Sequence, residues 1–164
     1  MATAGAPRAA ADSVSVWTGK EMIVWGGVDY SARISLGSLP SVGAGGRYDP
    51  GTDTWKILSP TNAPATRTEH RGVWTGREFL IWGGHMDTDT SREVLDSGAR
   101  YNPVSDTWAT LTIQNAPSRR VNSSAVWTGE AMLIFGGYPG SGVNGFDSNH
   151  AWIPGRTLYL YEKQ

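Results

Sequence analysis

The tetrapeptide Val16-Trp17-Thr18-Gly19 occurs three times in this chain, and its other copies are Val73-Trp74-Thr75-Gly76 and Val126-Trp127-Thr128-Gly129. The three tryptophans therefore follow one another at intervals of 57 and 53 residues. Ten residues before each tryptophan lies the proline of an Ala-Pro pair, at Pro7, Pro64 and Pro117. Eight residues after it lie an aromatic residue and two glycines, namely Trp25-Gly26-Gly27, Trp82-Gly83-Gly84 and Phe135-Gly136-Gly137. A period of this length indicates an array of similar supersecondary units.

A second motif recurs between these copies. Residues 47–55 read Arg-Tyr-Asp-Pro-Gly-Thr-Asp-Thr-Trp, and residues 100–108 read Arg-Tyr-Asn-Pro-Val-Ser-Asp-Thr-Trp. Asp or Asn followed by Pro is typical of the first two positions of a tight turn. The motif therefore predicts two strands joined by a turn, with the tyrosine on one strand and the tryptophan on the other.

Each unit reads as four short strands. The first ends at Val-Trp, and Thr-Gly with the following charged residue predicts a hairpin turn. The second is an apolar run typical of a strand buried on both faces: Met22–Trp25, Phe79–Trp82 and Met132–Phe135. The third and fourth carry the tyrosine and tryptophan of the second motif. The residues predicted to define the repeat are Trp17, Gly26, Gly27, Tyr48, Trp55, Trp74, Gly83, Gly84, Tyr101, Trp108, Trp127, Gly136 and Gly137.

Composition agrees with an all-β protein rich in turns. Of 164 residues 21 are glycine, roughly twice the ordinary share of ~7 %, and 18 % are charged, below the ordinary ~25 %. The net charge of -1 favours neither a nucleic acid nor a membrane as partner. The absence of cysteine excludes disulfides and thiolate metal sites. Neither a signal peptide nor a membrane span is recognisable, and the compartment stays open.

The Gly-Gly pair after an apolar strand, with a tyrosine and a tryptophan farther on, resembles the kelch repeat. Within this family the chain resembles the bacterial type and is similar to the central domain of galactose oxidase. It implies a β-propeller with blades of four antiparallel strands, at approximately 7–63, 64–116 and 117–164. Galactose oxidase chemistry is not expected, since its cofactor needs a cysteine that this chain lacks.

The third unit departs from the pattern. Residues 156–161 read as its third strand, and no Asp-Thr-Trp strand follows, so the last blade is expected to lack its own outer strand. Propellers have roughly 4–8 blades, and three cannot close a ring. We expect two copies to form a six-bladed homodimer, in which residues 1–6 of one chain pair beside 156–161 of the other. The alternative is a fragment of a longer propeller.

Four residues are candidate ligand contacts. Arg67 and Arg120 share one repeat position, and guanidinium groups bind carboxylates or sugar hydroxyls. Equally, such arginines could tie down neighbouring loop carbonyls. His70 lies three residues after Arg67, and Trp152 stands outside the repeat in a predicted loop. The resemblance implies that this region lies near the central channel of a propeller.

Other polar residues favour structural roles. Arg47 and Arg100 recur before the tyrosines, which favours an architectural role such as stacking on a tryptophan or hydrogen bonding between blades. Asp53 and Asp106 are expected to shape turns. Residues 85–89, His-Met-Asp-Thr-Asp, read as a solvated loop rather than a calcium site. We expect no metal and no cofactor. No nucleophile elbow, phosphate loop or zinc motif is present, so no catalytic residue is assigned.

Three functions remain open. The first is a non-catalytic scaffold or protein-binding module that displays variable loops on a rigid framework. The second is a carbohydrate-binding or sugar-epimerase-like protein that uses Arg67, His70, Arg120 and Trp152. The third is a truncated piece of a longer propeller.

Overall fold

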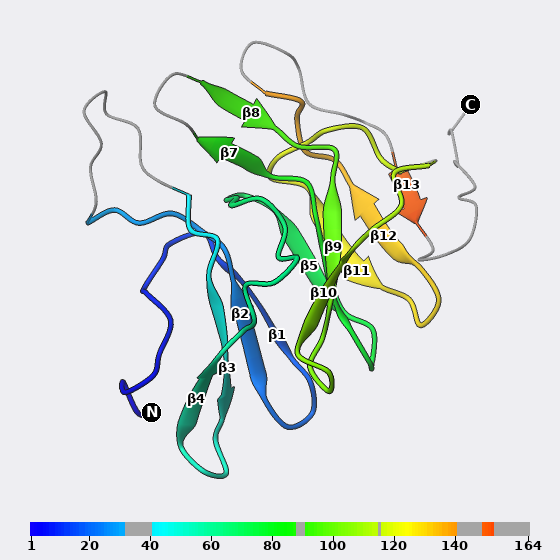
Figure 1. The fold of residues 1–164 in the computed structure, drawn as a ribbon. Helices are drawn as coiled ribbons and strands as arrows, with labels where there is room; N and C mark the ends of the chain where they lie inside the picture. The colour runs from blue at the N-terminus through cyan, green and yellow to red at the C-terminus, as the bar shows by residue number, and fades with distance from the viewer. Residues whose placement is uncertain (32–40, 88–90, 115, 141–148, 153–164) are drawn as a thin grey trace.

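The computed structural model describes residues 1–31, 41–87, 91–114, 116–140 and 149–152, the last four by their backbone alone. Thirteen β-strands and no helix lie within these residues, which confirms the all-β prediction (Figure 1). Accordingly, the described part of the chain has no helix that could cross a membrane.

The strands form three successive antiparallel sheets and one hairpin. Sheet 1 contains β1 (Val14–Trp17), β2 (Met22–Trp25), β3 (Gly45–Asp49) and β4 (Thr54–Ile57). Sheet 2 contains β5 (Arg71–Trp74), β6 (Phe79–Trp82), β9 (Gly98–Asn102) and β10 (Thr107–Thr110). Sheet 3 contains β11 (Ser124–Trp127), β12 (Met132–Phe135) and β13 (Asn149–Trp152). Four strands in chain order are thus confirmed for the first two units.

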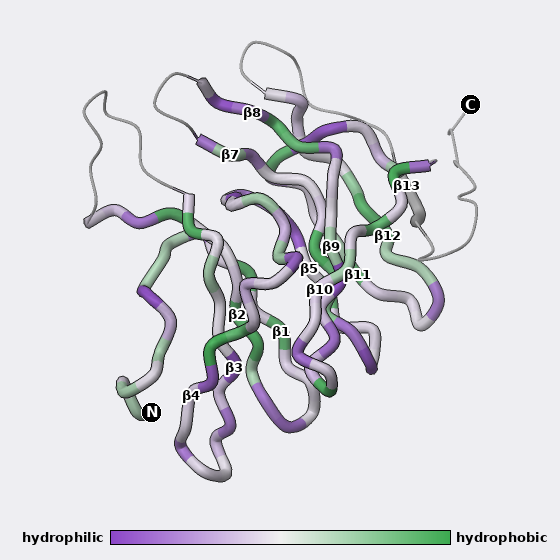
Figure 2. The backbone as a smooth tube through the Cα atoms, in the orientation of Figure 1, coloured by the Kyte–Doolittle hydropathy of each residue, from purple (hydrophilic) through white to green (hydrophobic). Residues whose placement is uncertain are grey.

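The Thr-Gly turns explain why the first two strands of each sheet pair. Thr18 Oγ1 accepts a hydrogen bond from Glu21 N at 2.9 Å and donates one to Glu21 O at 3.0 Å. Gly19 has a φ of 97°, a conformation that glycine adopts without steric cost. Thr75 and Thr128 repeat these bonds with Glu78 and Ala131. In Figure 2 hydrophilic residues gather at such hairpin turns, whereas hydrophobic stretches follow the strands.

The sheets pack face to face in chain order, and their first strands, β1, β5 and β11, lie side by side (Figure 1). Between sheets 1 and 2 the core contains Ile23, Trp25, Leu58, Phe79, Ile81, Ala99, Tyr101 and Trp108. Between sheets 2 and 3 it contains Val73, Leu80, Trp82, Leu111, Met132 and Ile134. Because side chains alternate along a strand, each sheet has two apolar faces. We call the face toward the next sheet along the chain the forward face, and the other the backward face.

The β12–β13 register corrects the interpretation of Trp152. In the pairing of the second and third strands, Met22 lies opposite Tyr48, Phe79 opposite Tyr101 and Met132 opposite Trp152. Trp152 is therefore not in a loop outside the repeat, but on a strand at the repeat tyrosine position. The third strand of sheet 3 is β13, while the segment expected to form it, 156–161, lies outside the described residues.

A short hairpin was not predicted. Strands β7 (His85–Asp87) and β8 (Arg92–Val94) pair with each other between β6 and β9, where the sequence predicts a solvated loop. The isolated bridge between Thr68 and His85 holds the hairpin against the segment that leads into sheet 2. As a result, His85 is only 2 % exposed.

Candidate functional site

Arg67 lies in the linker that joins β4 to β5, and it is 1 % exposed. Its Nη1 donates to Gly83 O at 3.1 Å and Ser97 O at 2.8 Å, and its Nε donates to Ala65 O at 3.1 Å. Burial lowers the pKa of Arg67 to about 10, which leaves the side chain charged at neutral pH. Its Nη2 donates to Ser97 Oγ at 3.3 Å, so every one of these donors is directed at a loop oxygen of its own chain. The geometry is that of a loop tie and not of an open ligand anchor.

Arg120 repeats this arrangement one sheet later. Its Nη1 donates to Gly136 O at 3.0 Å and its Nε to Ser118 O at 3.1 Å. The side chain is also 1 % exposed, and burial lowers its pKa. Two arginines at one repeat position thus fix the exit of the second strand to the linker that precedes their own sheet.

His70 is completely buried between sheets 1 and 2. Its ring packs edge-on against Trp25, with the ring centroids 5.5 Å apart. Burial, and to a lesser extent the positive charges of Arg67 and Arg71, lower the pKa of His70 to about 3. The imidazole is therefore neutral at physiological pH and serves the packing of the two sheets.

The four candidate residues come from three different segments of the chain. Arg67 and His70 belong to the linker before sheet 2, Arg120 to the linker before sheet 3, and Trp152 to the last strand of sheet 3. The two arginines and the histidine line neither the apolar pocket beside sheet 1 nor the polar cavity at β8. The sequence could not reveal this, because the carbonyl partners of Arg67 come from residues 16 and 30 positions away.

Of the two arginines that precede the repeat tyrosines, Arg47 joins neighbouring sheets as expected. Arg47 Nη1 donates to Pro103 O in the β9–β10 turn, which links sheet 1 to sheet 2. Its carboxylate partner, Glu21, lies 3.9 Å away, and Arg100 has the equivalent partner Glu78 at 3.8 Å. Asp53 and Asp106 accept hydrogen bonds from Tyr48 and Tyr101 at 2.5 and 2.6 Å, so each locks the β3–β4 or β9–β10 turn.

A polar cluster surrounds the β7–β8 hairpin. His85 Nδ1 lies 3.3 Å from Glu69 Oε2, and His85 Nε2 lies 3.3 Å from Asp87 Oδ2. Arg92 Nη2 lies 3.2 Å from the same Glu69 oxygen. Arg92 therefore neutralises the carboxylate beside the histidine. Within the described ranges no group of three His, Asp or Glu side chains is arranged to hold a metal.

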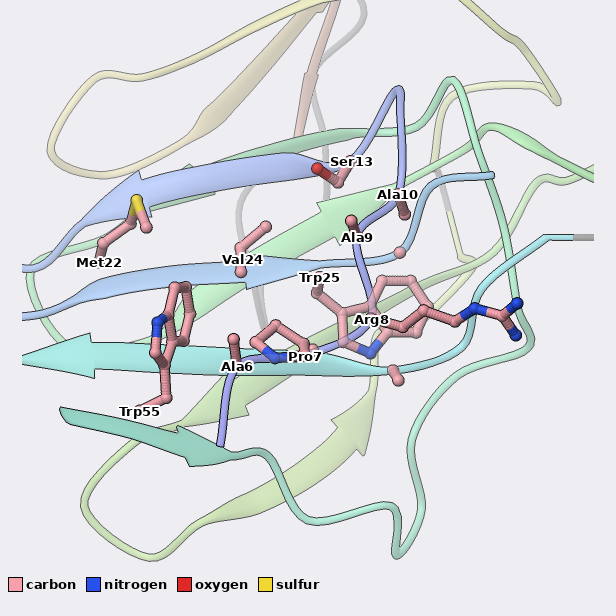
Figure 3. A pocket seen from close by; sticks show the side chains of 13 residues that line it. Ala6, Pro7, Arg8, Ala9, Ala10, Ser13, Met22, Val24, Trp25 and Trp55 are labelled. Carbon is pink, nitrogen blue, oxygen red and sulfur yellow. The ribbon is translucent and has the colours of Figure 1, made fainter. Parts of the chain in front are cut away.

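An apolar pocket of about 260 Å³ lies on the backward face of sheet 1 (Figure 3). We call it the N-terminal pocket, because residues 6–10 form one of its walls. The opposite wall is formed by sheet 1, and the pocket is lined by Ala6, Pro7, Arg8, Ala9, Ala10, Ser13, Met22, Val24, Trp25, Gly26, Ala44, Gly45 and Trp55. A second, more polar cavity of about 460 Å³ includes Arg92, Glu93 and Arg119.

Comparison with known proteins gives one short match. No family model matches the chain. Over 102 residues it is 31 % identical to the dynein alpha chain of the flagellar outer arm of Chlamydomonas reinhardtii, a match that covers 57 % of this chain and 2 % of that protein. The chain is thus similar to a small segment of a much longer protein.

Proposed function

We propose that this chain is half of a kelch-type β-propeller, a non-catalytic scaffold that self-associates head to tail into a six-bladed ring. The observation that carries the proposal is the exposed forward face of sheet 3. The ring would present its connecting loops for binding a further partner, as rigid frameworks with variable loops commonly do.

The same repeat positions differ sharply between sheets. In sheet 2, Leu80 and Trp82 are 0 % and 1 % exposed, and the equivalent Ile23 and Trp25 of sheet 1 are equally buried. In sheet 3, Leu133 and Phe135 are 37 % and 59 % exposed. A neighbouring sheet covers the first two pairs. The third pair is equally apolar, which supports a neighbour there too.

The backward face of sheet 1 is the surface that fits this role. It carries Met22, Val24 and Trp55, whose counterparts Phe79, Ile81 and Trp108 cover the forward face of sheet 1. The chain therefore contains both halves of one kind of interface, at opposite ends. Head-to-tail contacts must close into a ring or else extend into a filament. Two copies of three sheets fall within the roughly 4–8 blades of known propellers.

Measurement of the mass in solution tests the proposal. Multi-angle light scattering should give twice the chain mass of 17.7 kDa, about 35 kDa. Phe135→Asp should shift the protein to the monomer mass, because it places a charge in the apolar interface. The matched control is Val104→Asp, on the β9–β10 turn, where the valine is 93 % exposed and no neighbour is expected.

Two results would overturn the proposal. One is a wild-type chain that stays monomeric at concentrations of tens of micromolar while retaining its β-sheet spectrum. The other is an assembly that keeps growing with concentration instead of stopping at two copies.

A further inference from the structure

We infer that the two ends of the ring meet in a defined register, in which Phe135 of one chain packs against the partner's Trp55 and the partner's Ser13 at the N-terminal pocket. This inference rests on the proposed ring. It names the residues that touch across the interface and the hydrogen bond that joins the two backbones.

The packing of Trp25 between sheets 1 and 2 provides the template for the proposed contact of Phe135. The Trp25 ring packs at centroid distances of 5.5 Å against both His70 and Trp108 of the next unit. By repeat position, Phe135 corresponds to Trp25. The residues that correspond to His70 and Trp108 are Ser13 and Trp55, and both line the N-terminal pocket.

The pocket exists because small residues replace large ones at this end of the chain. In sheet 2 the Arg67 guanidinium bonds Gly83 O and Ser97 O, and the His70 ring lies close by. In sheet 1 the equivalent positions hold Ala10 and Ser13. The facing backbone bond is repeated, since Gly26 N donates to Ala44 O at 3.1 Å, as Gly83 N donates to Ser97 O at 3.1 Å. The apolar walls remain, as Figure 3 shows for Pro7, Met22, Val24 and Trp55.

The N-terminal segment has the conformation of a linker between sheets. Ala6 N donates to Thr3 O at 3.2 Å, as Ala63 N donates to Pro60 O at 3.1 Å. Gly5 has a φ of 74°, and the equivalent Asn62 has a φ of 58°. The contacts with sheet 1 also repeat: Ala2 N bonds Asp53 Oδ1 at 2.7 Å, and Ser59 N bonds Asp106 Oδ1 at 3.1 Å. Residues 1–13 are therefore already arranged to receive a preceding sheet.

A backbone bond defines the register. Gly27 N donates to Arg67 O at 2.9 Å, and Gly84 N donates to Arg120 O at 2.8 Å. Gly137 N is the next donor in this series, and the equivalent acceptor is the partner's Ala10 O. A ring closed in this way joins the forward face of sheet 3 to the backward face of sheet 1 in the other copy. It leaves residues 1–6 on their own sheet, whereas the sequence predicts a strand exchanged with residues 156–161.

Cysteine cross-linking tests the register, and the chain has no native cysteine to interfere. Val14 Cγ1 lies 2.8 Å from the Cβ position of residue 72, so this pair of positions is within disulfide reach. The equivalent pair across the proposed interface is Ser124 of one chain and the partner's Ser15. Both are exposed.

We expect Ser15→Cys/Ser124→Cys, when oxidised, to give a reducible covalent dimer on denaturing gels. The single variants and the control Ser105→Cys/Ser124→Cys should stay uncross-linked. Efficient cross-linking of a single variant would show that the same face of the two copies meets, and it would overturn the register. If the double variant fails to cross-link while the native mass is that of a dimer, the register is wrong and the proposed function stands. If the native mass is that of a monomer, both fail.

Discussion

The backward faces of sheets 1 and 2 carry the same repeat but differ in what covers them. On sheet 2, Trp108 is 3 % exposed beneath sheet 1, whereas the equivalent Trp55 on sheet 1 is partly exposed. Arg67 and His70 flank the covered face, and Ala10 and Ser13 flank the open one. The residues that look most functional in the sequence thus occur where one sheet is fixed to another. The open face is the more promising binding surface.

The largest expected effect is a difference in stability loss between substitutions on the forward faces of sheet 1 and sheet 3. Trp25→Ala should lower the free energy of unfolding by about 3–5 kcal/mol, because it leaves a cavity between sheets 1 and 2. Phe135→Ala, at the equivalent position on the open face, should cost under about 1 kcal/mol at concentrations low enough to dissociate the proposed dimer. Urea denaturation measures both. Equal losses would mean that Phe135 is already covered within its own chain.

The next largest loss of stability is expected for substitution of Arg67. Arg67→Ala removes three hydrogen bonds to backbone carbonyls in a buried setting, and it should lower the free energy of unfolding by about 3 kcal/mol. An exposed arginine in the next linker supplies the control, since Arg119→Ala should stay within about 0.5 kcal/mol of wild type. An unchanged stability of Arg67→Ala would favour the ligand-anchor interpretation instead.

Acid should weaken the covered interface through His70. Its pKa is about 3 in the folded protein and about 6.5 in the unfolded chain, so the unfolded chain binds more protons between these values. This residue's contribution should fall by about 1.4 kcal/mol per pH unit below 6.5, or about 2 kcal/mol by pH 5. His70→Ser, which copies Ser13 and Ser123, should remove that part of the pH dependence in urea titrations at pH 7, 6 and 5. An identical pH slope in the variant would contradict the assignment.

The smallest expected effect is the difference in stability loss between substitutions at two glycines with positive φ. Gly84, at the exit of β6, has a φ of 85°, and an added Cβ would lie 2.4 Å from Thr68 O. Gly76, in the Thr-Gly turn, has a φ of 91° and no atom within 4 Å of that position. Gly76→Ala should cost about 1 kcal/mol from backbone strain alone, and Gly84→Ala about 1–2 kcal/mol more from overpacking. Thermal melts would show both losses, and equal shifts would argue against a close contact at the strand exit.

Much of the fold could be predicted because its signals are local. The apolar runs at Met22–Trp25, Phe79–Trp82 and Met132–Phe135 coincide with β2, β6 and β12. The Thr-Gly and Asp-Pro turns depend on side chains within a few residues of the backbone groups that they bond. These features need no knowledge of the neighbouring sheet.

What could not be predicted depends on partners distant in sequence. The roles of Arg67 and Arg120 are set by the carbonyls of Ser97 and Gly136, which lie next to β9 and β12, and the burial of His85 depends on the Thr68–His85 bridge. Trp152 was missed because tryptophan replaces the repeat tyrosine. A signal was nevertheless present: the Ile153-Pro154-Gly155 that follows it parallels Asp49-Pro50-Gly51 after Tyr48.

The bond from Gly27 N to Arg67 O joins consecutive sheets through main-chain atoms alone. Such a bond does not depend on which side chain occupies position 67, so it would recur in a gene segment copied in tandem together with the apolar faces of its sheet. Lengthening the array by duplication is therefore open to this architecture from the first generation.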